Sequence, residues 1–154
     1  MSFIIKNTLT KCTKENTSFY RFDNKKYYCK VIDVYDGDTI TIAIKLNKKI
    51  FKHKVRMYGY DTPELKPRKD NPNRNQIIKN AKYTKQKLEE LILNKIVVIR
   101  IEGPTWDKYG RLLGTIFTRS KWGITMKGYD FNVNTFMLSF ACVNEYFGGT
   151  KKML

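Results

Sequence analysis

Acidic residues and histidine are scarce in this sequence. Of 154 residues, 14 are aspartate or glutamate, 30 are lysine or arginine, and one is histidine, so the formal net charge is +16. This excess of positive charge is larger than solubility requires, and it favours a polyanionic partner over a basic one. We expect nucleic acid rather than a membrane surface, because no basic amphipathic helix is evident. A solvated, lysine-rich surface is the simpler alternative.

Paired cysteines and long apolar runs are also absent. Cys12, Cys29 and Cys142 have no CxxC spacing, so we expect free thiols and no zinc site. No apolar run reaches the length of a transmembrane helix, and the apolar run before Lys6 is too short for a signal peptide. We therefore expect an intracellular protein. His53 lies between two lysines, and we expect it on a strand surface rather than in a catalytic role.

The pattern of apolar residues divides the chain into a polar extension, residues 1–24, and one domain, residues 25–154. Alternating and β-branched segments predict five strands, and apolar residues at helical spacing predict two helices. Turn signals lie at 36–38 and 47–49, and a small ribbon is possible at 120–128. The predicted strands are 27–34, 39–46, 50–60, 96–101 and 112–117, and the predicted helices are 77–94 and 132–142. A helix between the third and fourth strands of five favours a five-stranded OB-fold barrel, a Greek-key fold of the mainly β, α+β kind.

The few carboxylates gather near predicted turns. Asp38 opens the second strand and Asp61 ends the third, so the barrel can bring them to one rim. Two adjacent carboxylates repel each other unless a cation intervenes, and a hard divalent cation with oxygen ligands satisfies them. The carbonyl of Thr62 is a further candidate ligand. Glu64, just beyond Pro63, is placed to orient or deprotonate a water molecule.

Two arginines accompany these carboxylates. Arg56 precedes Asp61 by five residues, and Arg111 opens the fifth strand, so both guanidinium groups can reach the same rim as a phosphate clamp. Each fragment alone has a structural reading. The DGDT segment is a common hairpin turn, DTPE suits a helix N-terminus capped by Thr62, and Asp107 with Arg111 suits a plain ion pair. The argument rests on their joint occurrence in order.

The ordered segments DGDT (36–39), RMYGYDTPE (56–64) and DKYGR (107–111) resemble staphylococcal nuclease and its thermonuclease-like relatives. The resemblance spans about residues 27–152. It implies an OB-fold, Ca²⁺-dependent phosphodiesterase, a hydrolase with endonuclease or exonuclease activity on DNA and RNA. The short chain, ending near YFGGTKK, is similar to viral and eukaryotic members.

The resemblance also assigns roles to single residues. It implies metal ligands at Asp38, Asp61 and Thr62, with Asp36 supporting the metal site. Glu64 would be the general base, and Arg56 and Arg111 would bind the phosphate. The residues expected to contact the rest of the substrate are Lys108, Tyr109 and Tyr146.

The chain departs from the bacterial enzyme in its extension, in the segment before the first helix, in a longer region at 118–130, and in lacking the third helix. A site with two carboxylates and one carbonyl predicts weak calcium binding, about 10⁻⁴–10⁻³ M. We expect a monomer that prefers single-stranded or frayed nucleic acid. Two alternatives stay open: an OB-fold binding module without catalysis, and a structural protein whose charge serves packaging.

Overall fold

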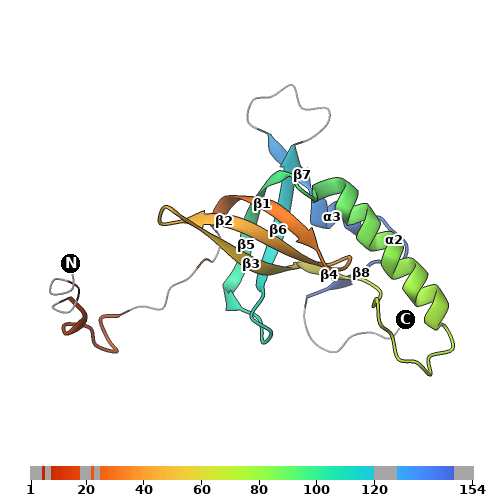
Figure 1. Ribbon diagram of the computed structural model, residues 1–154, viewed down its shortest axis with the longest axis horizontal. Helices are drawn as coiled ribbons and strands as arrows, with labels where there is room; N and C mark the ends of the chain where they lie inside the picture. The colour runs from red at the N-terminus through yellow and green to blue at the C-terminus, as the bar shows by residue number, and fades with distance from the viewer. Residues whose placement is uncertain (1–4, 6–7, 18–21, 23–24, 120–127, 148–154) are drawn as a thin grey trace.

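The structure is a computed structural model of residues 1–154. The structure describes residues 5, 8–17, 22, 25–119 and 128–147. The predicted ribbon at 120–128, apart from Gly128, and half of the extension therefore lie outside the described residues. Figure 1 shows a small β-barrel with helices packed along one side of it.

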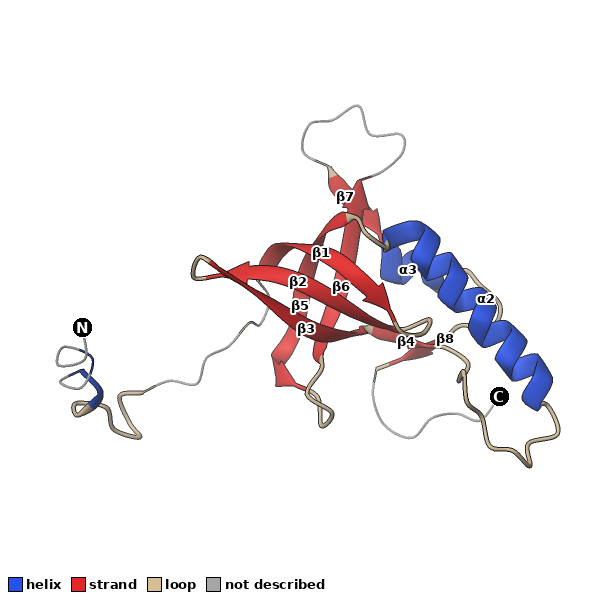
Figure 2. Ribbon diagram, viewed as in Figure 1, coloured by secondary structure: helices blue, strands red, loops and turns tan. Residues whose placement is uncertain are grey.

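Six strands form one twisted sheet in the order β3-β2-β1-β5-β6-β7, and a two-stranded sheet pairs β4 with β8. The strands and helices are coloured separately in Figure 2. The strands are β1 Lys26–Val34, β2 Thr39–Leu46, β3 Lys49–Met57, β4 Gly59–Asp61, β5 Ile96–Trp106, β6 Leu112–Arg119, β7 Tyr129–Asn132 and β8 Asn144–Tyr146.

The first five strands of the larger sheet close into a barrel. Closure occurs where β3 and β6 pair in parallel, with Arg56 opposite Leu113 in the register. The close packing of β6 against its neighbours at this point requires a small residue on β6. A Cβ atom added at Gly114 would lie 2.7 Å from Ile99 Cδ1 and 2.9 Å from Val55 Cγ1. The closed five-stranded barrel confirms the predicted OB-type fold.

Helix α2, Arg74–Ile92, packs beside the barrel and lies between β4 and β5 along the chain. Its buried residues are Ala81, Thr84, Leu88 and Ile92, which recur at helical spacing and form one face. The helix ends before Asn94, which has a φ of 61° in the left-handed region, as the prediction of an end near this residue requires.

Several element boundaries differ from the prediction. The third strand stops at Met57 rather than Tyr60, because Gly59 turns the chain at a φ of 88° and starts the separate strand β4. Strand β5 continues to Trp106, beyond the predicted end at residue 101. The second helix, α3 Val133–Met137, is only five residues long. Asn132 caps it by accepting a hydrogen bond from the Thr135 amide at 3.2 Å.

The core of the barrel is formed by inward side chains from all five barrel strands, together with side chains from α2 and α3. Phe22, from the extension, also belongs to this core, with its ring 5.9 Å from that of His53. His53 lies on β3 and is half-buried, and this burial lowers its pKa. All three cysteines are free, as predicted, and burial raises the pKa of Cys29 to about 12.

Within the described part of the chain, no helix has the length and apolar character needed to span a bilayer.

Candidate functional site

Four segments that are distant in sequence meet at one rim of the barrel: the turn between β1 and β2, the chain from Arg56 to Glu64, the turn from Asp107 to Arg111, and strand β8. They surround a cavity of about 460 Å³. All ten residues predicted for the site line this cavity, together with Pro63: Asp36, Asp38, Arg56, Asp61, Thr62, Glu64, Lys108, Tyr109, Arg111 and Tyr146. The barrel therefore places every one of them around a single space.

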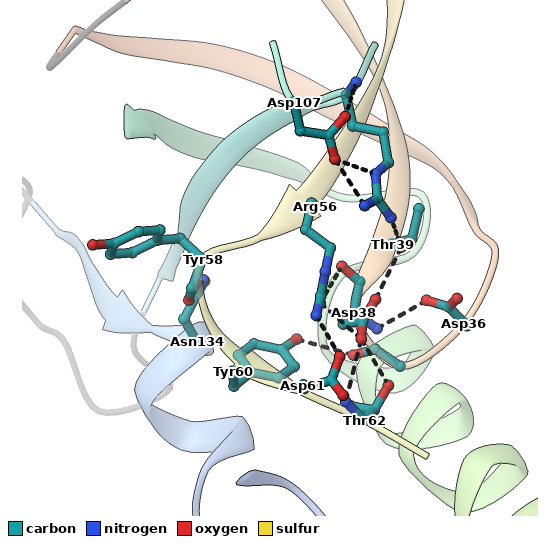
Figure 3. Close-up of polar contacts among 12 residues, drawn as sticks. Asp36, Asp38, Thr39, Arg56, Tyr58, Tyr60, Asp61, Thr62, Asp107 and Asn134 are labelled. Atoms are coloured by element: carbon teal, nitrogen blue, oxygen red, sulfur yellow. Dashed lines mark hydrogen bonds and ion pairs between the residues drawn. The ribbon is translucent and has the colours of Figure 1, made fainter. Parts of the chain in front are cut away.

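Asp38 lies at the centre of the polar network (Figure 3). Its Oδ1 accepts a hydrogen bond from the Thr39 hydroxyl at 2.9 Å. Its Oδ2 accepts bonds from the Thr62 amide at 3.2 Å and the Thr62 hydroxyl at 3.1 Å. The same oxygen lies 2.7 Å from Arg56 Nη1. These bonds join the start of β2 to the segment that follows β4, so they fix the shape of the rim.

Arg56 bridges two carboxylates. Its Nη1 pairs with Asp38, and its Nη2 lies 2.6 Å from Asp61 Oδ1. The side chains of Arg56 and Asp38 are each 9% exposed, so the ion pair is largely removed from water. Burial raises the pKa of Asp38, the Arg56 guanidinium opposes this rise, and the nearby Asp36 carboxylate adds to it. One guanidinium thus pairs with two carboxylates, and a third carboxylate, that of Asp36, lies close to Asp38.

The turn between β1 and β2 is held from below by helix α2 and β4. The Tyr60 hydroxyl, fully buried, donates to the Gly37 carbonyl at 3.0 Å. A Cβ atom at Gly37 would lie 2.7 Å from the Thr84 hydroxyl and 2.9 Å from Thr62. Gly37 is therefore needed for close approach, and Asp36 completes the turn by accepting the Asp38 amide at 3.1 Å.

The turn from Asp107 to Arg111 holds itself together. Asp107 Oδ2 accepts bonds from Arg111 Nε at 2.8 Å and pairs with Nη2 at 2.7 Å. Asp107 Oδ1 accepts the amides of Tyr109 and Arg111, both at 2.9 Å. Arg111 Nη1 also reaches the Thr39 hydroxyl at 3.2 Å, which links this turn to β2. The ion-pair reading of Asp107 and Arg111 is correct, and the pair also aims the guanidinium at the cavity edge.

The alternative in which DTPE starts a helix is wrong. Helix α2 begins at Arg74, and the Thr62 hydroxyl bonds to Asp38 instead of capping a helix. Glu64 is exposed at the mouth of the cavity, where water can reach it.

The carboxylate donors at this rim are of the type that a hard divalent cation binds, because they are oxygens and carry negative charge. The carboxylates of Asp38 and Asp61 already converge on one cationic group, and their donors are oxygens. The cavity lining holds four carboxylates, Asp36, Asp38, Asp61 and Glu64, against three cations, Arg56, Lys108 and Arg111. Within the described ranges, no group of three or more histidine, cysteine, aspartate or glutamate side chains is arranged to hold a metal ion. Asp38 and Asp61 bring two carboxylates to Arg56, one fewer than such a group needs.

Sequence reasoning missed several residues near the site. A second cavity of about 230 Å³ adjoins the first, and it includes Tyr58, Leu113 and Phe147 among its lining residues. The rings of Tyr58 and Phe147 meet edge to face with centroids 5.6 Å apart. The position of Tyr58 within RMYGYDTPE was an available signal, whereas Phe147 depends on the pairing of β8 with β4, which no local pattern indicates.

Asn134 was also missed, because its role depends on three separate segments. Its amide group donates to the carbonyls of Tyr58 at 2.8 Å and Gly114 at 3.0 Å. Its Oδ1 accepts the Ile116 amide at 2.9 Å. A buried asparagine on α3 thereby fixes β6 against the chain that leads from Arg56 to Asp61.

A closed five-stranded barrel with carboxylates and two arginines around one rim cavity defines an OB-type barrel protein whose rim carries both acidic and basic side chains. Residues 54–144, more than half of the chain, match the family described as staphylococcal nuclease homologue. The chain belongs to this family.

Two relatives are similar to this chain over much of its length. A protein of Methanocaldococcus jannaschii, named only as uncharacterized, is 31% identical over 147 residues, covering 76% of this chain and 69% of the relative. A Bacillus anthracis protein, likewise named as uncharacterized, is 32% identical over 117 residues, covering 71% of this chain and 51% of the relative. The chain thus spans about half the length of the second relative.

Proposed function

We propose that this chain is a metal-dependent phosphodiesterase that hydrolyses DNA, RNA or both with little sequence specificity. The observation that carries the proposal is the single cavity that gathers acidic oxygen donors, two oriented guanidinium groups and an exposed glutamate. Family membership supports the same reaction class. A phosphodiester in this cavity would meet positive charge from the arginines and an exposed carboxylate, that of Glu64.

Asp38, Asp61 and the Thr62 carbonyl are the proposed ligands of one Ca²⁺ ion, or of another divalent cation, and Asp36 orients Asp38 through its amide. When bound, the ion supplies Lewis-acid polarisation of a phosphoryl oxygen. The carboxylates that line the cavity outnumber its arginine and lysine side chains by one, which supports an added cation there.

Glu64 is the proposed general base. Its exposure at the cavity mouth allows a water molecule to approach it, and a carboxylate within hydrogen-bond reach can take the proton of an attacking water. Arg56 and Arg111 stabilise the charge that develops on the phosphoryl oxygens. Asp107 holds Arg111 before substrate arrives, so little reorganisation is needed at that side of the cavity.

Substrate binding is assigned to the surrounding basic and aromatic side chains. Tyr109 is 69% exposed, and the cations of Lys108 and Arg111 lie 5.1 and 5.3 Å from its ring centre. Tyr146 lines both cavities, with Arg56 5.9 Å from its ring centre. Unpaired bases stack on such rings, which favours single-stranded or frayed substrates. The loop before α2 and the first residue of the helix add positive charge that attracts the nucleic-acid backbone, through Lys66, Arg68, Lys69 and Arg74.

The experiment that tests the proposal follows cleavage of a labelled single-stranded DNA and a matching RNA with Ca²⁺, Mg²⁺ or chelator. We expect cleavage that requires a divalent cation, and a loss of at least about 10²-fold in Glu64→Gln. Glu90→Gln, on the exposed surface of α2, is the matched control and retains full activity. Tight, salt-dependent binding without cleavage under any metal would contradict the proposal and identify a binding module instead.

A further inference from the structure

A second group of aromatic and basic side chains lies on the outer surface of β1, β5, β6 and β7, away from the cavity. On β1, Cys29 and Val31 point into the core, so the alternate residues Tyr28 and Lys30 point outward. Tyr28 is 68% exposed, so its ring is accessible from solvent. We call this surface the distal face and define it by Lys26, Tyr28, Lys30, Phe117, Arg119 and Tyr129.

The aromatic rings of the distal face come from three strands. The rings of Tyr28 on β1 and Tyr129 on β7 meet edge to face with centroids 5.5 Å apart. Val98 lies between Tyr28 and Phe117 in the register of the sheet. Val98 has the outward parity of its strand yet is only 9% exposed, because the surrounding side chains cover it. The rings therefore form a continuous patch over the middle of the sheet.

Cations lie against these rings. Lys26 Nζ is 5.4 Å from the centre of Phe117, and Arg119 is 5.4 Å from the centre of Tyr129. Arg100 is 5.6 Å from Phe117 but also pairs with Glu102 at 2.6 Å. Among the described residues, none of Lys26, Lys30 and Arg119 has an ion pair with a carboxylate. The distal face is therefore net positive as well as aromatic.

We propose that the distal face binds a single strand of DNA or RNA, outside the cavity and in addition to it. Stacking platforms next to positive charge are what a flexible polyanion with flat bases requires. A basic protein partner is disfavoured by charge, and a folded apolar partner by the exposed cations. This inference rests on the proposed function, because it takes the same class of substrate and extends its contact surface.

The separation of the two surfaces sets the length of strand that can use both. Tyr28 lies six residues before the end of β1, and a strand rises about 3.3 Å per residue, so the distal face is roughly 20 Å from the rim. Figure 1 shows β7 at the top of the view and β4 in its lower half. At about 3.4 Å per stacked nucleotide, roughly six nucleotides cover this distance. A strand shorter than that reaches only one surface.

The experiment compares the binding of a fluorescently labelled 4-mer and 20-mer of single-stranded DNA, in chelator so that neither is cut. In the wild-type chain we expect the 20-mer to bind more tightly than the 4-mer. In Tyr28→Ala/Tyr129→Ala, and in Lys30→Glu/Arg119→Glu, we expect this ratio of affinities to fall about tenfold. Tyr28→Phe/Tyr129→Phe keeps the rings and retains the ratio.

The matched control is Lys79→Glu/Lys82→Glu, which makes the same change of charge on exposed positions of α2. The inference is overturned if the distal and control pairs change the ratio equally, or if the 4-mer loses as much affinity as the 20-mer. Thermal melting of each variant shows whether it is folded. If Tyr28→Ala/Tyr129→Ala is unstable, the test relies on Lys30→Glu/Arg119→Glu, in which both replaced side chains are exposed.

Binding in chelator is independent of cleavage, so the two proposals fail separately. If the distal variants lower the 20-mer to 4-mer affinity ratio but the wild-type chain never cleaves, binding at the distal face is supported and the proposed function is contradicted. If the chain cleaves with metal but the distal variants leave the affinity ratio unchanged, the proposed function is supported and binding at the distal face is contradicted.

Discussion

The two arginines of the site face the same cavity but are held in different ways. Arg56 is buried between Asp38 and Asp61, which come from two different segments of the barrel. Arg111 is 22% exposed and is held by Asp107, four residues away in the same turn. The first arrangement belongs to the tertiary structure, whereas the second is local. Arg56 therefore stabilises the fold by joining two segments, whereas Arg111 does not, although both are proposed to stabilise the charge that develops on the phosphoryl oxygens.

The largest expected effect comes from Arg56→Ala. Removing the guanidinium leaves two carboxylates close together, one of them buried, so we expect the free energy of unfolding to fall by about 3–5 kcal/mol. Urea denaturation measures this change. Arg56→Met/Asp38→Asn removes the charge from both partners and should recover part of the loss. A decrease below about 1 kcal/mol in Arg56→Ala would show that water already screens the pair.

Arg111→Ala should separate activity from stability. We expect the rate of cleavage to fall by about 10²–10³-fold, the effect of removing one donor to a developing anion. The unfolding free energy should change by no more than about 1 kcal/mol, because the ion pair with Asp107 is partly exposed. Cleavage kinetics and urea denaturation on the same preparation give both values. A stability loss equal to that of Arg56→Ala would erase the distinction between the two arginines.

A pair of glycine substitutions extends the comparison to the backbone. Gly37→Ala places a Cβ atom against Thr84 and Thr62, so we expect a loss of about 1–3 kcal/mol and a displaced Asp38. Gly110→Ala meets no atom within 4 Å, but its φ of 74° is unfavourable for alanine, so we expect about 1–2 kcal/mol. Thermal melting ranks the two, and cleavage should suffer more in Gly37→Ala. Equal losses of activity would contradict the view that only the first turn is locked by helix α2.

The smallest effect concerns pH. Burial alone would raise the pKa of Asp107, but hydrogen bonds from the Arg111 backbone and side chain and from the Tyr109 amide outweigh it, and the pKa lies below its usual value. A lowered pKa contributes stability above the unfolded value of about 3.9, and this contribution is lost as pH falls through the lowered value. Asp107→Asn should therefore lose less stability than the wild type between pH 5 and pH 2. Urea denaturation at both values measures this, with Asp130→Asn as the control for an exposed carboxylate.

Much of this architecture was predictable from local patterns. The β2 strand begins and ends where alternation and turn residues place it, and the hairpin after it uses positive φ at Asn47 and Lys48. The apolar face of α2 was likewise visible in the spacing of Ala81 and Leu88. The motifs also named the residues around the cavity, because family resemblance carries information on spatial proximity that propensity does not.

The remainder depends on contacts between distant segments. No local pattern indicates that Arg56 bridges two carboxylates, or that Asn134 joins β6 to the carbonyl of Tyr58. Gly59 ends the third strand early through its φ of 88°, which the apolar pattern of the segment conceals. The short length of α3 reflects packing against the barrel, since its apolar spacing predicted a longer helix.

The β3–β6 seam that closes the barrel affects both the order of folding and the loss of activity on heating. The seam pairs Val55–Met57 with Leu112–Gly114, segments more than fifty residues apart, so its formation carries a high loop-closure cost and is expected late in folding. Arg56 is part of the seam and Arg111 directly precedes it. A molecule in which the seam has opened retains its hairpins and its helix but has separated the two arginines. On heating, competence for cleavage should therefore vanish at a lower temperature than the circular-dichroism signal of secondary structure.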